Sequence, residues 1–388
     1  MSDRKKILIV NNNMKIGGVQ KALLEVLKEL HTRYDVTLLL FKKTGALLNE
    51  IPEDVSVLES GSHFRYLGFS QGECRTVRDK LTRGLYAVVS KTLGIGAAVR
   101  IMGMTVRHEC SEPYDTAVSF LHVGGFKLCY GGVAEYVLNH VTAAKKVCYI
   151  HCDYLNSGTD SPYSEKLYPR FDQIICVSES VRKQFIKVLP ELEEKTITVP
   201  NPVDVREIRA LSTRQPVFYE PGFLNLLTVA RLAGEKGIAR VIRALAQIKN
   251  SALRYYVVGD GRDRPELETM IRENGLEDSV FLVGEDKNPY RYMSGADLLV
   301  VPSYNEAAPV VFQEALVLGL PILSTRTLSA EEMIPPACGF VVDNTDEAIC
   351  QALGQISQDF GCVREKKEAV RKQTCKNQRF IDDFQIVL

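Results

Sequence analysis

Short apolar runs that alternate with helix-period segments constrain the fold of this chain more than any other feature. The runs are rich in Val, Ile and Leu, and apolar residues recur every three or four positions in the stretches between them. Continuous apolar strands are typical of parallel sheets that are covered by helices on both faces. The sequence therefore predicts an α/β protein of the doubly wound kind.

The alternation occurs twice, which predicts two sheets. The strands expected in the first half are Lys6–Val10, Val36–Phe41, Val55–Leu58, Thr116–Phe120, Lys146–Ile150, Gln173–Val177 and Thr196–Val199. The strands expected in the second half are Leu224–Val229, Arg254–Val258, Val280–Val283, Leu298–Val301, Pro321–Ser324 and Gly339–Val342.

The chain has 388 residues, which exceeds the size at which one hydrophobic core usually stops growing. Asn201-Pro202 interrupts regular structure, and the polar run from Ser212 to Pro221 reads as a linker. We expect an N-terminal domain over residues 1–205 and a C-terminal domain over 206–365. Residues 366–388 are expected to form a helix that either crosses back to the first domain or is simply solvated.

The charge balance and the cysteines narrow the class of protein. The 48 basic residues equal the 48 acidic ones, so no overall field favours nucleic acid as a partner. The ten cysteines form no framework, and the N-terminus runs into a strand without a secretory signal. These features predict a reduced, cytoplasmic protein without a transmembrane helix.

Residues 73–107 carry a local excess of positive charge. Seven basic and two acidic residues give a net charge of 7 − 2 = +5. Apolar residues such as Leu81, Leu85 and Val88 are interleaved with them. The segment is a candidate for peripheral contact with the inner face of the plasma membrane, or for a helix pair packed on the sheet.

A glycine pair, Gly17-Gly18, follows the first strand and opens the first helix. Glycines let a ligand approach the backbone, and the helix start offers unpaired N–H groups to a phosphate. The dinucleotide fingerprint GxGxxG is absent, and Phe41-Lys42-Lys43 stands where an acidic residue would hold a ribose. The NAD-binding interpretation therefore fails, while a phosphate or sugar site remains open.

Two cations follow the first strand of the second half. Arg231 and Lys236 lie at the carboxyl end of that strand, where ligands bind in open α/β sheets. A guanidinium and an ammonium together would neutralise a diphosphate. The next strand runs into Gly259-Asp260-Gly261, where absent side chains would admit a nucleotide close to the backbone.

Two glutamates, Glu306 and Glu314, are separated by seven residues after a predicted strand. Pro309 suits the first turn of a helix, so Glu306 falls in the loop and Glu314 inside the helix. A nucleotide sugar is long enough to touch both, with its diphosphate at the helix N-terminus.

These motifs, in this order, resemble the retaining glycosyltransferases of the group called family 4, which have the GT-B fold. The match rests on the glycine pair, the two cations, the Gly-x-Gly turn and the glutamate segment with its following Gly319-Leu320-Pro321. The resemblance implies two Rossmann-like domains that face a central cleft, the first for the acceptor and the second for the donor.

The family's site residues are carried over by motif match. Arg231 and Lys236 are implied to bind the diphosphate, Glu306 to lie by the donor sugar, and Glu314 to hold the ribose. His151, in the segment after the fifth strand, is implied to lie beside the reacting sugar. The other residues implied in donor binding are Gly259, Gly261, Ala307, Ala308, Pro309 and Val310. Many members have a glycine at the position of Ala307, a departure that leaves the donor sugar open.

The resemblance implies transfer of a sugar from a nucleotide diphosphate donor, UDP-linked or GDP-mannose, to a glycan or lipid-linked acceptor. Synthesis of capsular, exopolysaccharide or other cell-surface glycans is the expected setting. No Asp-x-Asp motif is present, so we expect neither a metal nor another cofactor. The alternatives are an epimerase or phosphorylase of the same fold and a non-catalytic nucleotide-sugar-binding subunit.

Overall fold

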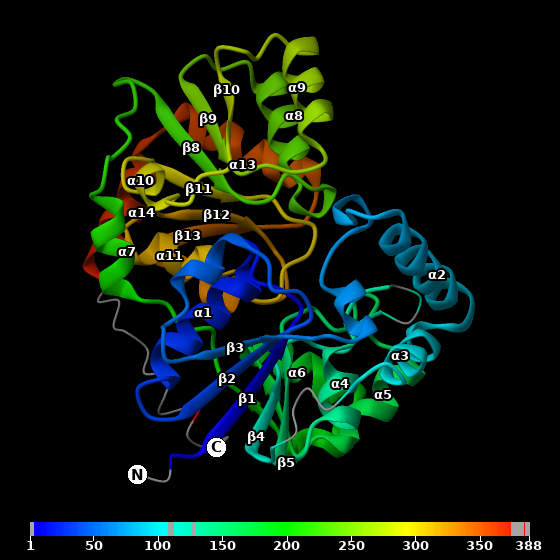
Figure 1. Ribbon diagram of the computed structural model, residues 1–388. Helices are drawn as coiled ribbons and strands as arrows, with labels where there is room; N and C mark the ends of the chain where they lie inside the picture. The colour runs from blue at the N-terminus through cyan, green and yellow to red at the C-terminus, as the bar shows by residue number, and fades with distance from the viewer. Residues whose placement is uncertain (1–3, 108–111, 126, 128, 374–383, 385–388) are drawn as a thin grey trace. The chain divides into compact units, whose positions relative to one another are not determined.

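The computed structural model describes residues 4–107, 112–125, 127, 129–373 and 384, and it divides into two compact units (Figure 1). The N-terminal unit extends to Pro202 and includes Phe384, and the C-terminal unit begins at Val203. Each unit is an α/β structure with its own parallel sheet.

The N-terminal unit contains a seven-stranded sheet in the order β3-β2-β1-β4-β5-β6-β7, with all pairs parallel. The strands are β1 (Lys6–Asn11), β2 (Asp35–Leu40), β3 (Ser56–Glu59), β4 (Tyr114–Ser119), β5 (Ala143–Ile150), β6 (Gln173–Cys176) and β7 (Thr196–Thr198). The helices are α1 (Gly18–Leu30), α2 (Val77–Leu93), α3 (Ile95–Gly103), α4 (Val133–His140), α5 (Pro162–Leu167) and α6 (Glu179–Val188).

The C-terminal unit contains a six-stranded parallel sheet in the order β10-β9-β8-β11-β12-β13. The strands are β8 (Leu224–Val229), β9 (Leu253–Val258), β10 (Val280–Gly284), β11 (Leu298–Val301), β12 (Ile322–Thr325) and β13 (Gly339–Val342). The helices are α7 (Val205–Ser212), α8 (Ile238–Ile248), α9 (Arg264–Glu273), α10 (Tyr290–Met293), α11 (Val310–Val317), α12 (Ala330–Met333), α13 (Asp346–Gln358) and α14 (Gly361–Lys372).

Helices cover both faces of the C-terminal sheet, and each face has a separate apolar core. One core joins the sheet to α8, α9, α13 and α14, and the other joins it to α10, α11 and α12. The central strands are buried on both sides, which is why their sequences read as continuous apolar runs. The doubly wound architecture expected from the sequence is confirmed.

Both sheets change the direction of strand addition once. In the N-terminal sheet the change falls between β1 and β4, and in the C-terminal sheet it falls between β8 and β11. The connections that leave two such strands diverge to opposite faces, so a crevice opens at their carboxyl ends. These two edges are the places where the fold itself favours a ligand.

Every strand expected from the sequence is present, with ends shifted by up to three residues. The run from Ser212 to Pro221, expected as a linker, lies inside the C-terminal unit, where the Tyr219 hydroxyl donates to the Tyr292 carbonyl at 3.0 Å. The units divide at Pro202, and α7 already belongs to the second of them.

The end of the chain differs from the expected helix over 366–388. Helix α14 runs across the expected boundary at residue 365, and Lys367 on it donates to the Ala296 carbonyl at 2.8 Å within the C-terminal unit. Phe384 belongs to the N-terminal unit, where its ring stacks on Tyr149 with centroids 6.4 Å apart. The rest of the expected crossing segment lies outside the described residues.

Candidate functional site

The carboxyl ends of β8 and β11 bring a cation and a carboxylate together. Lys236 ends a short 3-10 helix after β8, and Glu306 lies in the loop after β11. The Lys236 Nζ donates to Glu306 Oε1 at 2.6 Å, and the Ser303 hydroxyl donates to the same oxygen at 2.8 Å. Both side chains of the ion pair are mostly buried. Two of the predicted site residues therefore meet at the crevice that the topology creates.

Gly237 and Arg240 hold this crevice in shape. Gly237 has a φ of +66°, and a Cβ on it would lie 2.1 Å from the Pro302 carbonyl oxygen at the end of β11. The fully buried Arg240 donates to the same carbonyl at 3.0 Å and to Asp346 at 2.7 Å. Sequence reasoning missed Arg240, although a cation on the apolar face of α8 was a signal for it.

Arg231 pairs with Glu235, the residue that precedes Lys236. Its exposed guanidinium donates to Glu235 Oε1 at 2.5 Å, and Arg262 approaches the other oxygen of that carboxylate. Partial burial alone would raise the pKa of Glu235, but its own backbone N–H and the cations Arg231, Lys236 and Arg262 hold it below the ordinary value. Three cations, two from the segment after β8 and Arg262 from the turn after β9, therefore surround one ionised carboxylate.

The Gly259-Asp260-Gly261 turn packs against the loop that carries Arg231. A Cβ on Gly259 would lie 1.9 Å from the Ala230 carbonyl oxygen, and one on Gly261 would lie 2.2 Å from that of Leu232. The sequence predicts that these glycines leave room for a nucleotide. The neighbouring backbone takes the space that side chains would fill, so the packing of this turn also requires glycine at both positions.

Helix α11 brings the second glutamate into the protein interior. Pro309 stands just before the helix, one residue earlier than expected, and Val310 opens it. Glu314 is buried, and its Oε1 accepts a hydrogen bond of 2.8 Å from the Tyr290 hydroxyl. Ala307 is also buried. Glu314 is thus a fixed acceptor inside the helix rather than a solvated surface carboxylate.

The N-terminal unit presents its predicted residues at the corresponding edge of its own sheet. Gly17 precedes α1 and Gly18 opens it, with nothing within 4 Å of a Cβ placed on Gly18. Asn12, at the end of β1, is buried, and neither of its side-chain polar atoms has a hydrogen-bond partner in the described part of the chain. Sequence reasoning missed Asn12, because an isolated asparagine after a strand is an ordinary turn residue.

His151 follows the carboxyl end of β5. Its ring stacks on Tyr149 with centroids 5.2 Å apart and tilts against Phe120 at 4.9 Å. Burial, with a smaller contribution from His122, lowers the pKa of His151 to about 3. The imidazole is therefore neutral at physiological pH, and within the described residues its Nε2 has no hydrogen-bond partner.

A comparison with known protein families identifies the family of the domain that contains this site. The profile of the family described as Glycosyl transferases group 1 matches residues 215–376, which contain β8 to α14 and the Lys236–Glu306 pair. The chain carries a glycosyl transferases group 1 domain. Arg231, Lys236, Gly259, Gly261 and the segment from Glu306 to Glu314 all lie within this group 1 domain.

Two curated relatives match part of the chain. The chain is 34% identical to the lipopolysaccharide glucosyltransferase WaaG of Escherichia coli over 141 residues, which are 34% of this chain and 37% of WaaG. A second relative is the N-acetylgalactosamine-N,N'-diacetylbacillosaminyl-diphospho-undecaprenol 4-alpha-N-acetylgalactosaminyltransferase of Campylobacter jejuni. The two chains are 28% identical over 196 residues, and these residues are 50% of this chain and 52% of that protein. The matches thus span about half or less of these relatives.

Solved structures share the fold over the whole chain. HepE of Anabaena, solved in complex with UDP and glucose, aligns with a TM-score of 0.67 at 19% identity and covers 99% of this chain and 98% of its own. WaaG aligns with a TM-score of 0.67 at 17% identity and covers 98% of this chain and 99% of its own. The fold of the chain, including its N-terminal unit, is therefore that of the GT-B glycosyltransferases.

Proposed function

We propose that this protein is a retaining glycosyltransferase that moves a sugar from a UDP-linked donor to a glycan or lipid-linked acceptor in cell-surface glycan synthesis. The observation that carries the proposal is the Lys236–Glu306 pair at the β8/β11 edge of a group 1 domain. The complex of HepE with UDP and glucose favours UDP over GDP-mannose as the donor carrier. The diphospho-undecaprenol in the name of the Campylobacter relative favours a lipid-linked acceptor.

The residues of the C-terminal unit bind the donor in this proposal. Lys236 and Arg231 neutralise the diphosphate, and the N–H groups at the start of α11 stabilise it further. Glu306 accepts hydrogen bonds from the donor sugar, and the buried Glu314 accepts them from the ribose. Because Lys236 already pairs with Glu306 at 2.6 Å, it reaches a diphosphate beside the sugar with a small change of rotamer.

The transfer step needs a stabilised leaving group. The acceptor hydroxyl attacks the anomeric carbon on the face that the diphosphate leaves, the bond to the diphosphate oxygen breaks with its electron pair, and the hydroxyl proton passes to that phosphate. Each preorganised donor aimed at the growing charge supplies about 3 kcal/mol of transition-state stabilisation. Within the N-terminal unit, His151 is a neutral imidazole and the backbone at Gly18 is open, which supports the roles that the family resemblance implies for them.

An activity assay with and without acceptor tests the proposal. We expect UDP release from a UDP-sugar to depend on a lipid-linked saccharide acceptor, after a thermal-shift screen of UDP, GDP and ADP sugars has identified the donor. Rapid conversion of donor without any acceptor would indicate an epimerase. A binding subunit would instead bind the donor but transfer its sugar to no acceptor. In that case Glu306→Ala would cause no loss of cellular glycan.

We also propose that helix α2 contacts an anionic membrane surface at the cytoplasmic side. Its residues Val77, Leu81, Leu85 and Val88 are between 60% and 74% exposed. At 100° per residue they fall within an 80° stripe, opposite the buried Tyr86. An exposed apolar stripe of this length on one helix is typical of interfacial helices.

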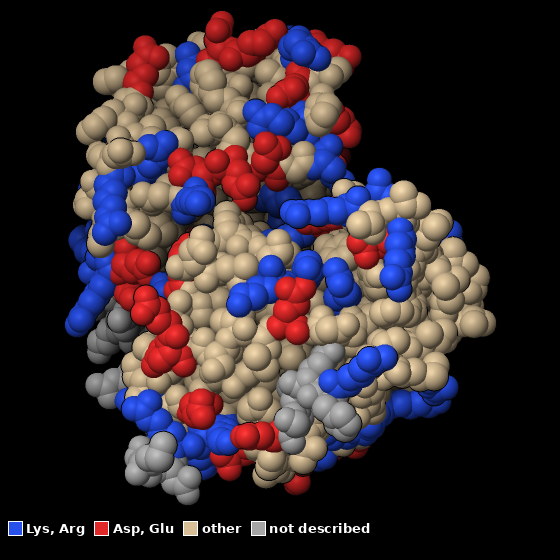
Figure 2. Space-filling view, in the orientation of Figure 1, with Lys and Arg blue, Asp and Glu red and all other residues tan. Residues whose placement is uncertain are grey.

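Basic residues border the apolar stripe of α2. Arg78 lies on one side of it, and Lys80 and Lys91 lie on the other, by the same helical geometry. Figure 2 shows lysine and arginine side chains around the uncharged surface in the region of α2. No described helix has both the length and the hydropathy needed to cross a bilayer.

Vesicle co-sedimentation tests the membrane contact. We expect the protein to bind vesicles containing phosphatidylglycerol and not vesicles of phosphatidylcholine alone, and Leu81→Ser with Leu85→Ser to abolish this binding. Phe218→Ser, which removes an apolar side chain that is 89% exposed in the C-terminal unit, is the matched control and should bind normally. Equal sedimentation of both variants would contradict the contact.

A further inference from the structure

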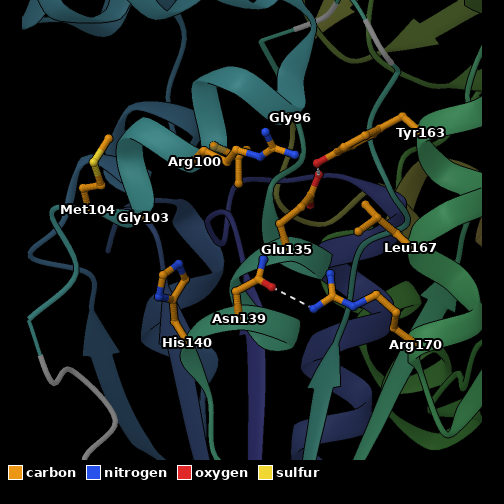
Figure 3. A pocket seen from close by; sticks show the side chains of 11 residues that line it. Gly96, Arg100, Gly103, Met104, Glu135, Asn139, His140, Tyr163, Leu167 and Arg170 are labelled. Atoms are coloured by element: carbon orange, nitrogen blue, oxygen red, sulfur yellow. Dashed lines mark hydrogen bonds between the residues drawn. The ribbon is translucent and has the colours of Figure 1, made fainter.

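The N-terminal unit contains a cavity of about 490 Å³ between α3, α4 and the segment from α5 to Arg170 (Figure 3). The last turn of α4 and Arg170 lie just before β5 and β6, so this part of the wall is at the amino ends of those strands. Gly17, Gly18 and His151 lie instead at carboxyl ends. The cavity is therefore separate from the proposed transfer site, and its volume is typical of small-molecule sites.

Two guanidinium groups line the cavity from different elements. Arg100 comes from α3, and Arg170 follows α5 and donates to the Asn139 side-chain oxygen at 2.8 Å. In the described ranges neither arginine has a carboxylate partner. Guanidinium groups that line one cavity without a carboxylate partner favour the binding of an anion, and their planar forks match phosphate oxygens.

A buried carboxyl group completes the polar wall. Glu135 on α4 is 1% exposed, and its Oε1 accepts a hydrogen bond of 3.0 Å from the Tyr163 hydroxyl. Its Oε2 is buried without a hydrogen-bond partner among the described residues. Burial raises the pKa of Glu135, which favours the protonated acid, and a protonated carboxyl donates to an anion instead of repelling it.

We propose that this cavity binds a phosphate ester, with the phosphate oxygens between Arg100 and Arg170 and one of them accepting from the unpaired oxygen of Glu135. The apolar side chains of Val99 and Leu167 also line the cavity, so it accommodates the organic part of an ester as well as the charged group. The inference does not rest on the transfer reaction, because all of these residues lie in the N-terminal unit.

Titration with two kinds of phosphate ester tests this proposal. Glycerol 3-phosphate is the free ester, and glycerophosphoglycerol, the deacylated headgroup of phosphatidylglycerol, presents the lipid's phosphodiester without a membrane surface that α2 could bind. We expect Arg100→Met and Arg170→Met each to weaken binding of one of these probes about 10-fold or more, the loss of a charge-assisted hydrogen bond. Arg33→Met, an exposed arginine at the α1–β2 turn, is the control and should bind as wild type.

The response of Glu135→Gln separates a direct contact from a structural effect. The amide keeps a donor group and the acceptor for Tyr163, so binding should persist and should weaken less with rising pH than in the wild-type protein, where His140 of the same cavity also titrates. Retained binding in Lys236→Met would separate this cavity from the donor site. The proposal would be overturned if the Arg100 and Arg170 variants bound both probes as wild type does. It would also be overturned if only Lys236→Met abolished binding. If Arg170→Met does not fold, the exposed Arg100 carries the test.

Discussion

Replacement of Lys236 by methionine removes one charge from the proposed diphosphate site while preserving most of the length of the side chain. In the unliganded protein the lost contact is a mostly buried ion pair with Glu306, and Ser303 still donates to the same carboxylate oxygen. Such a loss costs the fold about 1 kcal/mol. We therefore expect the variant to fold and to melt only about 2–4 °C below wild type.

The effect on the nucleotide should be much larger than the effect on the fold. A charge-assisted hydrogen bond to a phosphate contributes about 1.5–3 kcal/mol, which corresponds to a loss of about 10- to 150-fold in affinity. Isothermal titration with UDP at physiological salt measures this loss. Uridine, which lacks the diphosphate, should bind both proteins equally.

Lys367→Met is the matched control for Lys236→Met. Lys367 pairs with Asp297 at 3.1 Å with similar exposure, but that pair lies at the amino end of β11, whereas Glu306 follows its carboxyl end. The control should lose comparable stability and no affinity for UDP. If Lys236→Met binds UDP like wild type, or if both variants lose affinity equally, the assignment of Lys236 is wrong.

Three further results are expected. In urea unfolding, Gly237→Ala should lower the free energy of unfolding by about 3 kcal/mol or more, because it adds overlap with Pro302 to the strain of a positive φ. Gly275 has a similar φ but open space around it, so Gly275→Ala should cost only about 1–2 kcal/mol. Because the pKa of His151 is lower in the folded than in the unfolded protein, the free energy of unfolding should fall as the pH drops from 6.5 to 3. This group should contribute up to about 1.4 kcal/mol per pH unit. His151→Asn should reduce that slope, and an unchanged slope would refute the burial argument. Turnover should persist in EDTA, and complete loss there would contradict a metal-independent reaction.

The strands were predictable because each is buried on both faces and is therefore apolar along its whole length. The apolar run at Leu298–Val301 is one example, and its ends coincide with those of β11. The polar run from Ser212 to Pro221 misled, because its few apolar residues, such as Tyr219, pack on the unit that follows. Composition alone does not distinguish such a packed segment from a linker.

The candidate site was predictable where function depends on residue type and order, as at Lys236 and Glu306. It was not predictable where the cause is contact between distant segments. Arg240 reaches Pro302 from 62 positions away, and the missing side chain of Gly259 makes room for the backbone carbonyl of Ala230. Contacts of this kind depend on the tertiary structure, which a single sequence does not reveal.

A crystal structure of the protein with UDP bound would examine the donor assignment at the level of atoms. The diphosphate should lie within hydrogen-bond distance of Lys236 and the start of α11, and the ribose hydroxyls should contact Glu314. A nucleotide found away from the β8/β11 edge, with Lys236 still paired to Glu306 and Glu314 untouched, would contradict the account.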